Sequence, residues 1–428
     1  MDTIFALASA VGKAGVSIIR ISGPDALTVV AQMGVVIGDH DRKLVRLVDG
    51  AKNLIDEVFA ISFGSGRSFT GEQVVELQTH GSPAVVSAVT SELIRLKVRQ
   101  AEAGEFTRRA MESGALDLAR VEGLADLIDA ETEGQRRQAI RVFKGDLGNL
   151  ADGWRQKLIR AAALLEATID FVDEDVPLDV YPEVRDLVQF VSREVRKEAE
   201  GVGIRERVRD GFEIALIGPP NSGKSTLLNR LAGREAAITS DIAGTTRDVI
   251  EISMDLNGLP VTVLDTAGQR DATDKLENIG IQRGRERASD ADVRIHLSSD
   301  GVFEPSTYES GVDLFVRSKS DLGPNNCHLS LSAKTGDGVA KLMELIGAEL
   351  QSRVSSAGIA TRKRHEVSLR TADSALQVVL NGLGDASIPV DLLSDDLRQA
   401  IRSLDNLIGR VDVENVLDEI FSNFCIGK

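Results

Sequence analysis

The 428-residue sequence predicts a mixed α/β and all-α protein, and three patterns along the chain support this fold class. Residues 1–115 contain short runs with alternating apolar side chains, such as VSIIRISG at 16–23, which predict a small α/β domain. Residues 116–210 and 351–428 repeat apolar residues at intervals of three and four, which is typical of amphipathic helices. Residues 211–350 alternate strand-like and helix-like segments, which predicts a parallel sheet with crossover helices.

Charge and cysteine content limit the classes of protein and partner. The formal net charge of −16 opposes non-specific attraction to nucleic acid, so an RNA partner would need a local basic patch or a second protein. The two cysteines, Cys327 and Cys425, cannot form a disulfide framework. The sequence has no secretory signal and no apolar run of membrane-spanning length. These features predict a soluble cytoplasmic protein with no membrane contact.

Helical sequence flanks the central α/β segment on both sides. Before it, apolar residues recur at helical spacing over 118–165, and an acidic break with two prolines follows at 172–183. After it, a polar linker at 351–366 leads into another amphipathic run over 393–408. Because domain termini often lie close together, we expect one discontinuous helical domain into which residues 211–350 are inserted.

A phosphate-binding loop is predicted at GPPNSGKS, residues 218–225. The segment matches G-x-x-x-x-G-K-[ST], follows the apolar strand EIALIG and precedes the helix-forming STLLNRLAG, which is the context that this motif requires. In such a loop, backbone N–H groups contact phosphate oxygens, Lys224 reaches the β and γ groups, and the Ser225 hydroxyl ligates Mg²⁺. The candidate nucleotide-binding residues are Asn221, Ser222, Gly223, Lys224, Ser225 and Thr226.

Two further segments predict a switch-type GTPase. VTVLDTAG places Asp265 at the end of an apolar strand, where it can hold the metal through water, and Gly268 where its N–H can contact the γ-phosphate. GTTRD, residues 244–248, supplies two threonines, of which Thr246 is the candidate that binds Mg²⁺ only when the γ-phosphate is present. A solvated loop is the alternative interpretation of GTTRD.

Base recognition is predicted at DLFVRSKSD, where the usual guanine motif N-K-x-D reads Ser318, Lys319 and Asp321. Asp321 can accept hydrogen bonds from the N1–H and 2-amino groups of guanine, which adenine does not offer in that pattern, and the Lys319 stem can cover the ring. Since Ser318 is shorter than the usual Asn, we expect looser nucleotide binding. The segment LSAKTG adds three candidate residues, Ser332, Ala333 and Lys334, with the Ala333 N–H directed to guanine O6.

These motifs occur together with several more specific segments. They include VSIIRISG, SFTGEQVVELQTHG, AGEFTRRAMESGALDLARVEGLADLIDA and FCIGK. With the phosphate loop, DIAGTTRD and DTAG, they make the sequence similar, nearly from end to end, to the bacterial tRNA-modification GTPases of the MnmE/TrmE family. The resemblance implies an N-terminal folate-binding and dimerisation domain at 1–115, a discontinuous helical domain, and an inserted Ras-like P-loop GTPase domain.

The resemblance also implies a reaction and its ligands. Members of this family form homodimers and work with an FAD-containing partner of the MnmG/GidA type, in a heterotetramer, to install a (carboxymethyl)aminomethyl group at C5 of the tRNA wobble uridine. The implied ligands are GTP, Mg²⁺, K⁺, tRNA and a tetrahydrofolate derivative in the 5-formyl or 5,10-methylene form. The family's folate contacts fall on Arg20, Glu76 and Lys428. A carboxylate suits the adjacent N–H donors of a pterin edge, and cations suit the glutamyl tail.

Two of these assignments have structural alternatives. Without the resemblance, Arg20 and Glu76 would be interpreted as a cross-strand or surface ion pair. Cys425 is a catalytic candidate, because the resemblance puts it near the one-carbon site, but packing as a small buried residue in a docked helix suits it equally well. The terminal CIGK is a poor prenylation signal, because Lys is unsuitable in the last position.

Two residues compete to orient the attacking water. Gln269 directly follows DTAG, where Ras-type GTPases carry their water-orienting Gln. The resemblance favours Glu277 in DATDKLENIGIQR instead, and loss of a water-orienting carboxylate should lower the rate by orders of magnitude. The resemblance also assigns the compensating positive charge to K⁺, for which hard oxygen ligands are suitable. The implied K⁺ ligands are Asn221, Ser240, Ile242 and Thr245.

Two other functions remain open at this level. One is a regulatory or ribosome-assembly GTPase without RNA chemistry; VVELQTHG and CIGK argue against it, and an absence of folate binding would favour it. The other is a folate-dependent aminomethyl or methyl transferase whose GTPase domain is only a conformational switch. Loss of modification in hydrolysis-dead variants that still bind GTP would argue against that second alternative.

Overall fold

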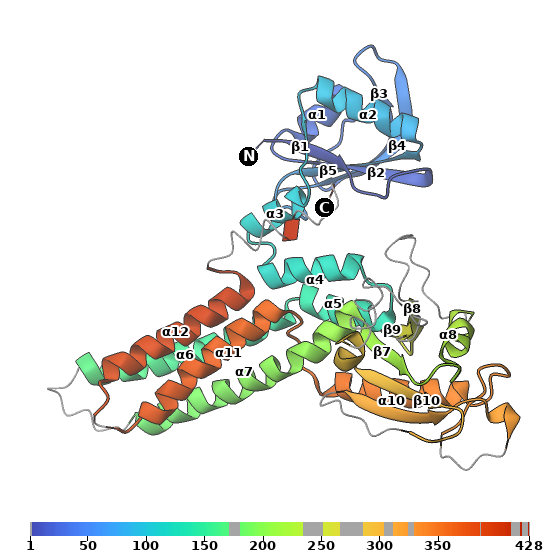
Figure 1. The fold of residues 1–428 in the computed structure, drawn as a ribbon. Helices are drawn as coiled ribbons and strands as arrows, with labels where there is room; N and C mark the ends of the chain where they lie inside the picture. Colours follow the sequence, from blue (N-terminus) through green and yellow to red (C-terminus); the bar gives the residue numbers. More distant parts are fainter. Residues whose placement is uncertain are drawn as a thin grey trace, which may run out of the picture. The chain divides into compact units, whose positions relative to one another are not determined.

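The computed structural model of the chain describes residues 2–170, 180–233, 251–265, 286–303, 311–323, 329–385, 387–411, 420–421 and 427. The chain forms two compact units, one made of Met1–Ala125 with Asp405–Lys428 and the other of Asp126–Leu404 (Figure 1). The C-terminal segment therefore belongs to the same unit as the N-terminal domain. Every helix that the structure describes is too short or too polar to cross a lipid bilayer.

The first unit contains a six-stranded sheet and the helices that pack on it. Its strands are β1 (Ile4–Leu7), β2 (Ala14–Ser22), β3 (Arg42–Val48), β4 (Leu54–Phe63), β5 (Val74–Gly81) and β6 (Arg99–Gln100). Its helices are α1 (Ala26–Gln32), α2 (Pro83–Arg95), α3 (Glu105–Glu112) and most of α4 (Leu118–Ile128). The strand order is β3-β4-β5-β2-β1-β6.

Side chains of β1 alternate between the two faces of this sheet. Phe5 packs into a core shared with α1 and α2, whereas Ile4 and Ala6 pack against Phe106 of α3. Figure 1 shows α1 and α2 beside the sheet. The alternating apolar pattern of this region therefore arises from a sheet that is covered on both faces along β1.

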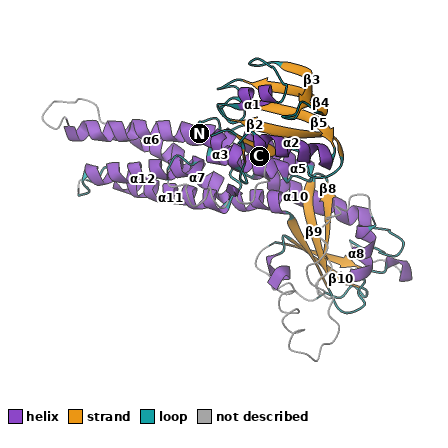
Figure 2. Ribbon diagram, turned by 90° about the horizontal axis from the view of Figure 1, so that it is seen from above, coloured by secondary structure: helices purple, strands orange, loops and turns teal. Residues whose placement is uncertain are grey.

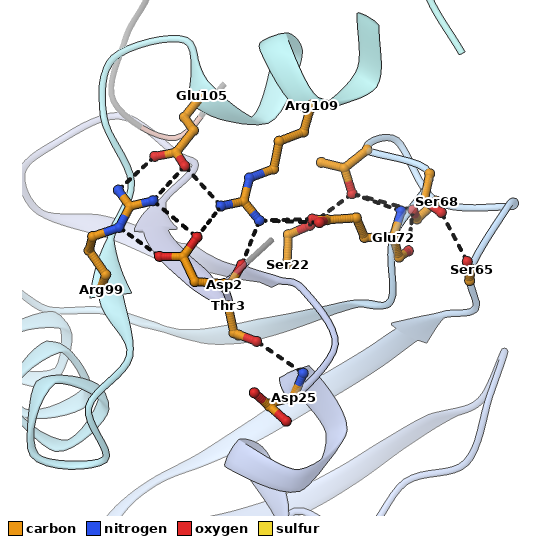
Figure 3. A network of polar contacts seen from close by, with 12 residues as sticks. Asp2, Thr3, Ser22, Asp25, Ser65, Ser68, Glu72, Arg99, Glu105 and Arg109 are labelled. Carbon is orange, nitrogen blue, oxygen red and sulfur yellow. Dashed lines mark hydrogen bonds and ion pairs between the residues drawn. The ribbon is translucent and has the colours of Figure 1, made fainter. Parts of the chain in front are cut away.

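A network of charged side chains connects the beginning of the chain to α3 (Figure 3). Arg109 of α3 is only 5% exposed and donates hydrogen bonds to Asp2, Glu72 and Glu105. Arg99 of β6 also donates hydrogen bonds to Asp2 and Glu105. The hydrogen bonds from Arg99 are the main cause that lowers the pKa of Asp2 to about 2. Local sequence patterns do not predict this network, because its members are up to 107 residues apart.

The second unit begins with a bundle of long helices. They are α5 (Glu133–Phe143), α6 (Asp146–Asp170), α7 (Tyr181–Asp210), α11 (Lys363–Gly382) and α12 (Val390–Ile408). α5 starts at a capping box, in which the Thr132 hydroxyl accepts from the Gln135 N–H and the Gln135 side chain accepts from the Thr132 N–H. Figures 1 and 2 show α6, α7, α11 and α12 side by side, and the hydroxyl of Ser192 on α7 donates to Asp373 on α11 over 2.6 Å.

The inserted domain is built on a five-stranded sheet. Its elements are β7 (Phe212–Ile217), α8 (Lys224–Ala232), β8 (Glu251–Leu256), β9 (Leu259–Asp265), β10 (Val293–Ser298), β11 (Val312–Arg317), the 3₁₀ turn η1 (Ser320–Leu322) and α10 (Val339–Ser356). The strand order is β11-β10-β7-β9-β8, and all pairs are parallel except β8 with β9. Asn257 and Gly258, both with positive φ, join β8 to β9 in a two-residue turn. The prediction of a parallel sheet is correct apart from this edge hairpin, which the Asn-Gly pair signals.

The inserted domain joins the helices at two adjacent points. α7 leads directly into β7 through Gly211, and the chain returns through 357–362 to α11. The Glu198 carboxylate on α7 accepts hydrogen bonds from the N–H groups of Ile359 and Ala360, over 2.7 and 3.2 Å. The chain segments before and after residues 211–350 therefore contact each other, and the bounds of the inserted domain stay a prediction. The predicted linker at 351–366 is shorter than expected, because α10 continues to Ser356 and α11 begins at Lys363.

Candidate functional site

The phosphate loop joins β7 to α8, as the sequence predicts. β7 ends at Ile217 and α8 begins at Lys224. Gly218 has a φ of 154°, and a Cβ there would lie 2.2 Å from the carbonyl oxygen of Leu297, so only glycine fits this position. The Ser222 hydroxyl is buried and has no hydrogen-bond partner among the described residues. A phosphate oxygen is an acceptor that would satisfy it.

Three predicted site residues meet at the carboxyl edge of the sheet. The Ser225 hydroxyl, in the first turn of α8, donates to Asp265 at the end of β9 over 2.8 Å. Lys224 is 5% exposed, and its Nζ donates to the carbonyl oxygens of Gly218 and Pro219 over 2.7 and 2.9 Å. Burial lowers the pKa of Lys224, while the Asp265 charge acts in the opposite direction. A hydroxyl and a carboxylate side by side form a donor set suitable for Mg²⁺.

The two segments predicted to recognise guanine are also adjacent. The Ser320 N–H donates to the carbonyl oxygen of Leu331 over 3.1 Å. The Ser332 hydroxyl donates to the Asp321 carboxylate and lowers the pKa of that group. Lys319 has a φ of 55° and precedes the η1 turn that carries Asp321. The Asp321 carboxylate is exposed and anionic at neutral pH, which suits an acceptor for two N–H groups of guanine.

Ser298 was not predicted as part of this region. It ends β10, and its carbonyl oxygen accepts a hydrogen bond from the Ser318 N–H over 2.8 Å. The Ser298 hydroxyl donates to Asp300. The sequence could have indicated Ser298 through its position at the carboxyl end of an apolar strand, because ligands of open α/β sheets bind at this edge.

Ser318 is buried beside the phosphate loop. It is 2% exposed, and its hydroxyl has no hydrogen-bond partner within the part of the chain that the structure describes. An ideal Cβ on Gly223 would lie 4.0 Å from the Ser318 Oγ. The phosphate loop and the segment that carries Ser318 therefore face each other at this point without a polar contact between these two residues. The longer amide of an Asn side chain at position 318 would reach across this distance.

Replacing Ser318 by Asn is expected to tighten nucleotide binding. One added hydrogen bond between a buried amide and the phosphate loop contributes about 1 kcal/mol, so the dissociation constant for GDP should fall roughly fivefold. Fluorescence titration with a labelled GDP measures this change. Ser318→Ala is the matched control and should bind GDP much as the original protein does, because the Ser318 hydroxyl has no hydrogen-bond partner among the described residues. Equal affinities of the Asn variant and the original protein would contradict the expectation.

The predicted folate residues Arg20 and Glu76 lie directly opposite each other on β2 and β5. Arg20 Nε donates to Glu76 Oε1 over 2.9 Å, and its Nη2 lies 2.8 Å from the same oxygen. The Arg20 guanidinium is also 5.6 Å from the ring centres of Phe69 and Phe106. This geometry agrees with the interpretation as a cross-strand pair and leaves the folate assignment a prediction.

The C-terminal segment reaches this pair. The carbonyl oxygen of Gly427, the residue before Lys428, accepts from Arg20 Nη1 over 3.5 Å. Phe421 is buried against Val121, and the Arg108 guanidinium lies 5.1 Å from its ring centre. Phe421 and Gly427, the described residues of this segment, therefore contact the N-terminal part of the chain, and Gly427 lies beside Arg20.

Several candidate residues lie outside the described part of the chain. They are Ser240, Ile242, Thr245, Thr246, Gly268, Gln269, Glu277, Cys425 and Lys428. Asn221 is described; it is exposed and has a φ of 61°, a left-handed conformation that Asn adopts more readily than most residues. The roles of all these residues stay predictions.

The geometry defines the class of protein. A glycine-containing loop connects a strand to a helix in a largely parallel sheet, and Lys224, Ser225 and Asp265 converge on that loop. Adjacent segments equivalent to the guanine motifs lie at the same edge. This combination is that of a P-loop nucleoside triphosphatase of the GTPase type.

Within that class, the chain belongs to the MnmE family of tRNA modification GTPases. The family described as "MnmE helical domain" matches residues 118–425, and the one described as "GTP-binding protein TrmE N-terminus" matches residues 3–115. The tRNA modification GTPase MnmE of Cereibacter sphaeroides (strain ATCC 17029 / ATH 2.4.9) is 55% identical over 429 residues, and that of Dinoroseobacter shibae is 52% identical over 430 residues. Both alignments cover 100% of each chain. The predicted family and fold class are confirmed.

Among solved structures, the G domain of the T. maritima FeoB iron transporter aligns with 33% of this chain and 98% of its own. The sequence identity is 22% and the TM-score is 0.26. A TM-score this low supports no conclusion about the present protein.

Proposed function

We propose that this protein binds and hydrolyses GTP and that this cycle drives modification of C5 of the tRNA wobble uridine with a folate one-carbon unit. The observation that carries the proposal is the convergence of Lys224, Ser225 and Asp265 beside the paired guanine-type segments. Membership of the MnmE family supports the tRNA reaction. The residues of the site bind the nucleotide, whereas the reaction on RNA depends on the N-terminal unit and on partners.

The proposed nucleotide site combines groups that the structure describes with Thr246, which lies outside the described residues. Lys224 Nζ, which bonds to loop carbonyls, holds the β- and γ-phosphates. Mg²⁺ would be held by the hydroxyls of Ser225 and Thr246 and, through water, by Asp265, and it would neutralise phosphate charge. Asp321 and the Lys319 stem select guanine, and the Ala333 N–H contacts O6.

For hydrolysis we propose Glu277 rather than Gln269 as the residue that orients water. The positive charge at the transition state is assigned to K⁺, with oxygen ligands from Asn221, Ser240, Ile242 and Thr245. Asn221 suits this role because it is exposed at the phosphate loop rather than packed in a core. The proposal extends family properties to these positions of the chain.

Turnover of GTP is expected to be faster in KCl than in matched NaCl buffer, and ATP turnover is expected to be low in both. Glu277→Ala should lower the rate by about 10²–10³-fold while GTP still binds, because a positioned water-orienting group contributes on this scale. Gln269→Ala is the matched control and should retain most activity. The rate of phosphate release is measured for the original protein and for both variants. Cation-independent turnover, or a larger loss in Gln269→Ala, would overturn the assignment.

The proposed folate site is at the Arg20–Glu76 pair. The Glu76 carboxylate would accept from the N–H donors of a pterin edge, while Arg20 and Lys428 would contact the glutamyl tail. The aromatic rings of Phe69 and Phe106 near Arg20 offer apolar surface for a flat ring system. Cys425 would lie near the one-carbon site, in a catalytic or a packing role.

Glu76→Gln is expected to weaken binding of 5-formyltetrahydrofolate by at least about tenfold, because a charge-assisted hydrogen bond to the pterin contributes about 1.5–3 kcal/mol. The matched control is Glu57→Gln, since Glu57 forms the equivalent cross-strand pair with Arg46 on β4 and β3, over 3.0 Å. Calorimetric titration measures binding by both variants. If both bind folate as the original protein does, Arg20 and Glu76 are only a structural pair.

Family membership and the net charge of the chain support the proposed protein partners. We propose a cytoplasmic homodimer that forms a heterotetramer with an FAD-containing partner of the MnmG/GidA type. The net charge of −16 supports a division in which the partner provides most of the contacts to tRNA. A regulatory GTPase without RNA chemistry is the alternative, and an absence of folate binding would favour it.

A further inference from the structure

A cavity of 290 Å³ lies where the helices meet the inserted domain. It is formed by α5, α7, α10 and the turn between β8 and β9. The polar side chains that line it include Arg137, Gln138, Arg141, Arg205, Asn257 and Gln351. Among the lining residues that the structure describes, Glu133 is the one acid, so this part of the cavity is rich in hydrogen-bond donors and poor in acids.

Arg205 carries a buried charge in the wall of this cavity. It is 9% exposed, and its Nε and Nη2 donate to the carbonyl oxygens of Gly358 and Ala357 over 2.6 and 2.8 Å. Its Nη1 donates to Gln138 Oε1 over 3.5 Å. These hydrogen-bond acceptors are neutral, and the nearby Glu198 carboxylate, which accepts from the N–H groups of Ile359 and Ala360, offsets part of the Arg205 charge. A buried guanidinium whose charge is only partly offset favours a further anion nearby.

Two further arginines lie one helical turn apart on α5. Arg137 shares Glu133 with Arg136, so one carboxylate faces two guanidinium groups. Arg141 is 3.7 Å from Asp146, a distance too long for a good hydrogen bond. Burial, and then the charge of Arg141, lowers the pKa of Arg205, which means that the two cations are close enough to repel. Among the described lining residues, three arginines face one carboxylate, that of Glu133, while Asp146 and Glu198 lie near Arg141 and Arg205.

The cavity also contacts the hairpin between the two predicted switch segments. The Gly134 N–H on α5 donates to the carbonyl oxygen of Gly258 over 2.7 Å, and Gln351 Nε2 on α10 donates to that of Asn257 over 3.1 Å. β8 follows the GTTRD segment, and β9 leads to DTAG. A ligand in the cavity would therefore contact the helical bundle and this hairpin together.

We propose that this cavity binds the phosphate group of a small, multiply charged anion. Guanidinium groups bind phosphate through paired, charge-assisted hydrogen bonds, which Arg137 and Arg141 can supply from α5. Arg205 on α7, whose three nitrogens already donate to neutral acceptors, adds positive charge to the cavity. The volume is at the lower limit of ligand pockets, which begin at about 300 Å³, so it suits a phosphate or diphosphate better than a whole nucleotide. The bound anion connects α5 and α7 to the β8–β9 hairpin. This site is separate from the phosphate loop and does not depend on the proposed function.

The test is calorimetric titration of inorganic pyrophosphate into the full-length protein in Mg²⁺-free buffer, with the phosphate loop saturated by GDP. Saturable binding is expected, and the double variant Arg137→Gln, Arg141→Gln should weaken it by at least about tenfold. Both side chains are largely exposed, so the variant should fold, which circular dichroism checks. Arg136→Gln is the matched control, because Arg136 shares Glu133 but does not line the cavity; it should bind pyrophosphate as the original protein does.

Three results would overturn the proposal. They are no saturable binding by the GDP-saturated protein, unchanged binding by the double variant, and equal weakening in Arg136→Gln, which would indicate only the general charge of α5. Competition with unmodified tRNA identifies the source of the phosphate. Displacement of pyrophosphate by tRNA would assign the phosphate to an RNA backbone, and no displacement would assign it to a free anion.

Discussion

Lys224→Ala is expected to lower the rate of GTP hydrolysis by about 10²–10³-fold, because one preorganised charged donor to the transferring phosphate contributes on this scale. Lys224 is buried at the phosphate loop, where its Nζ bonds to two loop carbonyls, so the neutral methyl group of Ala cannot replace it. We also expect weaker binding of labelled GTP, since in the proposed site the same amine holds the β-phosphate in the ground state. Phosphate release and fluorescence titration measure the two effects.

Lys341→Ala is the control for this prediction. Lys341 is an exposed lysine of α10, and its loss should leave both quantities unchanged. A Lys224→Ala protein that hydrolyses GTP at the original rate would show that the loop between β7 and α8 does not hold the reacting phosphates.

Arg109→Gln is expected to destabilise the first unit by about 3–5 kcal/mol, because removing one partner of a buried charge network leaves carboxylates without compensation. Arg109 donates to both oxygens of Glu72, over 3.1 and 3.2 Å, and to Glu105 over 2.9 Å (Figure 3). Both acids are largely buried. The first thermal transition of the full-length protein should occur at lower temperature, and hydrogen exchange should increase in β1 and α3.

The control and the pH dependence test the same mechanism. Arg46→Gln removes an exposed cross-strand pair with Glu57 and should change stability little. The pKa of Asp2 is lowered from 3.8 to about 2, chiefly by Arg99, so the folded state binds this proton less readily than the unfolded chain. Its contribution is present above about pH 4 and is lost as the pH falls toward 2. If Arg109→Gln melts as the original protein does, the network is not important for stability.

Local sequence determined the elements that carry the nucleotide site. The phosphate loop, the apolar strands around it and the helical periodicity outside 211–350 could all be predicted, because each depends on residues within about ten positions of one another. The Asn257–Gly258 turn was equally local, and its signal was available. Glu277 and Cys425 belong to the family pattern, and their roles remain predictions.

Only the tertiary structure decided which distant residues meet. Arg20 faces Glu76 because β2 pairs with β5 rather than with β3, and the two residues are 56 positions apart. The contact of Gly427 with Arg20 spans 407 positions, and Arg205 reaches Gly358 across 153. Such contacts depend on strand order and on where helices cross, which are set by burial of the whole apolar surface rather than by neighbouring residues. The cavity between α5, α7 and the β8–β9 turn also depends on such long-range contacts. Its arginines occupy helix positions that look ordinary in the sequence, and they are neighbours only in the folded protein.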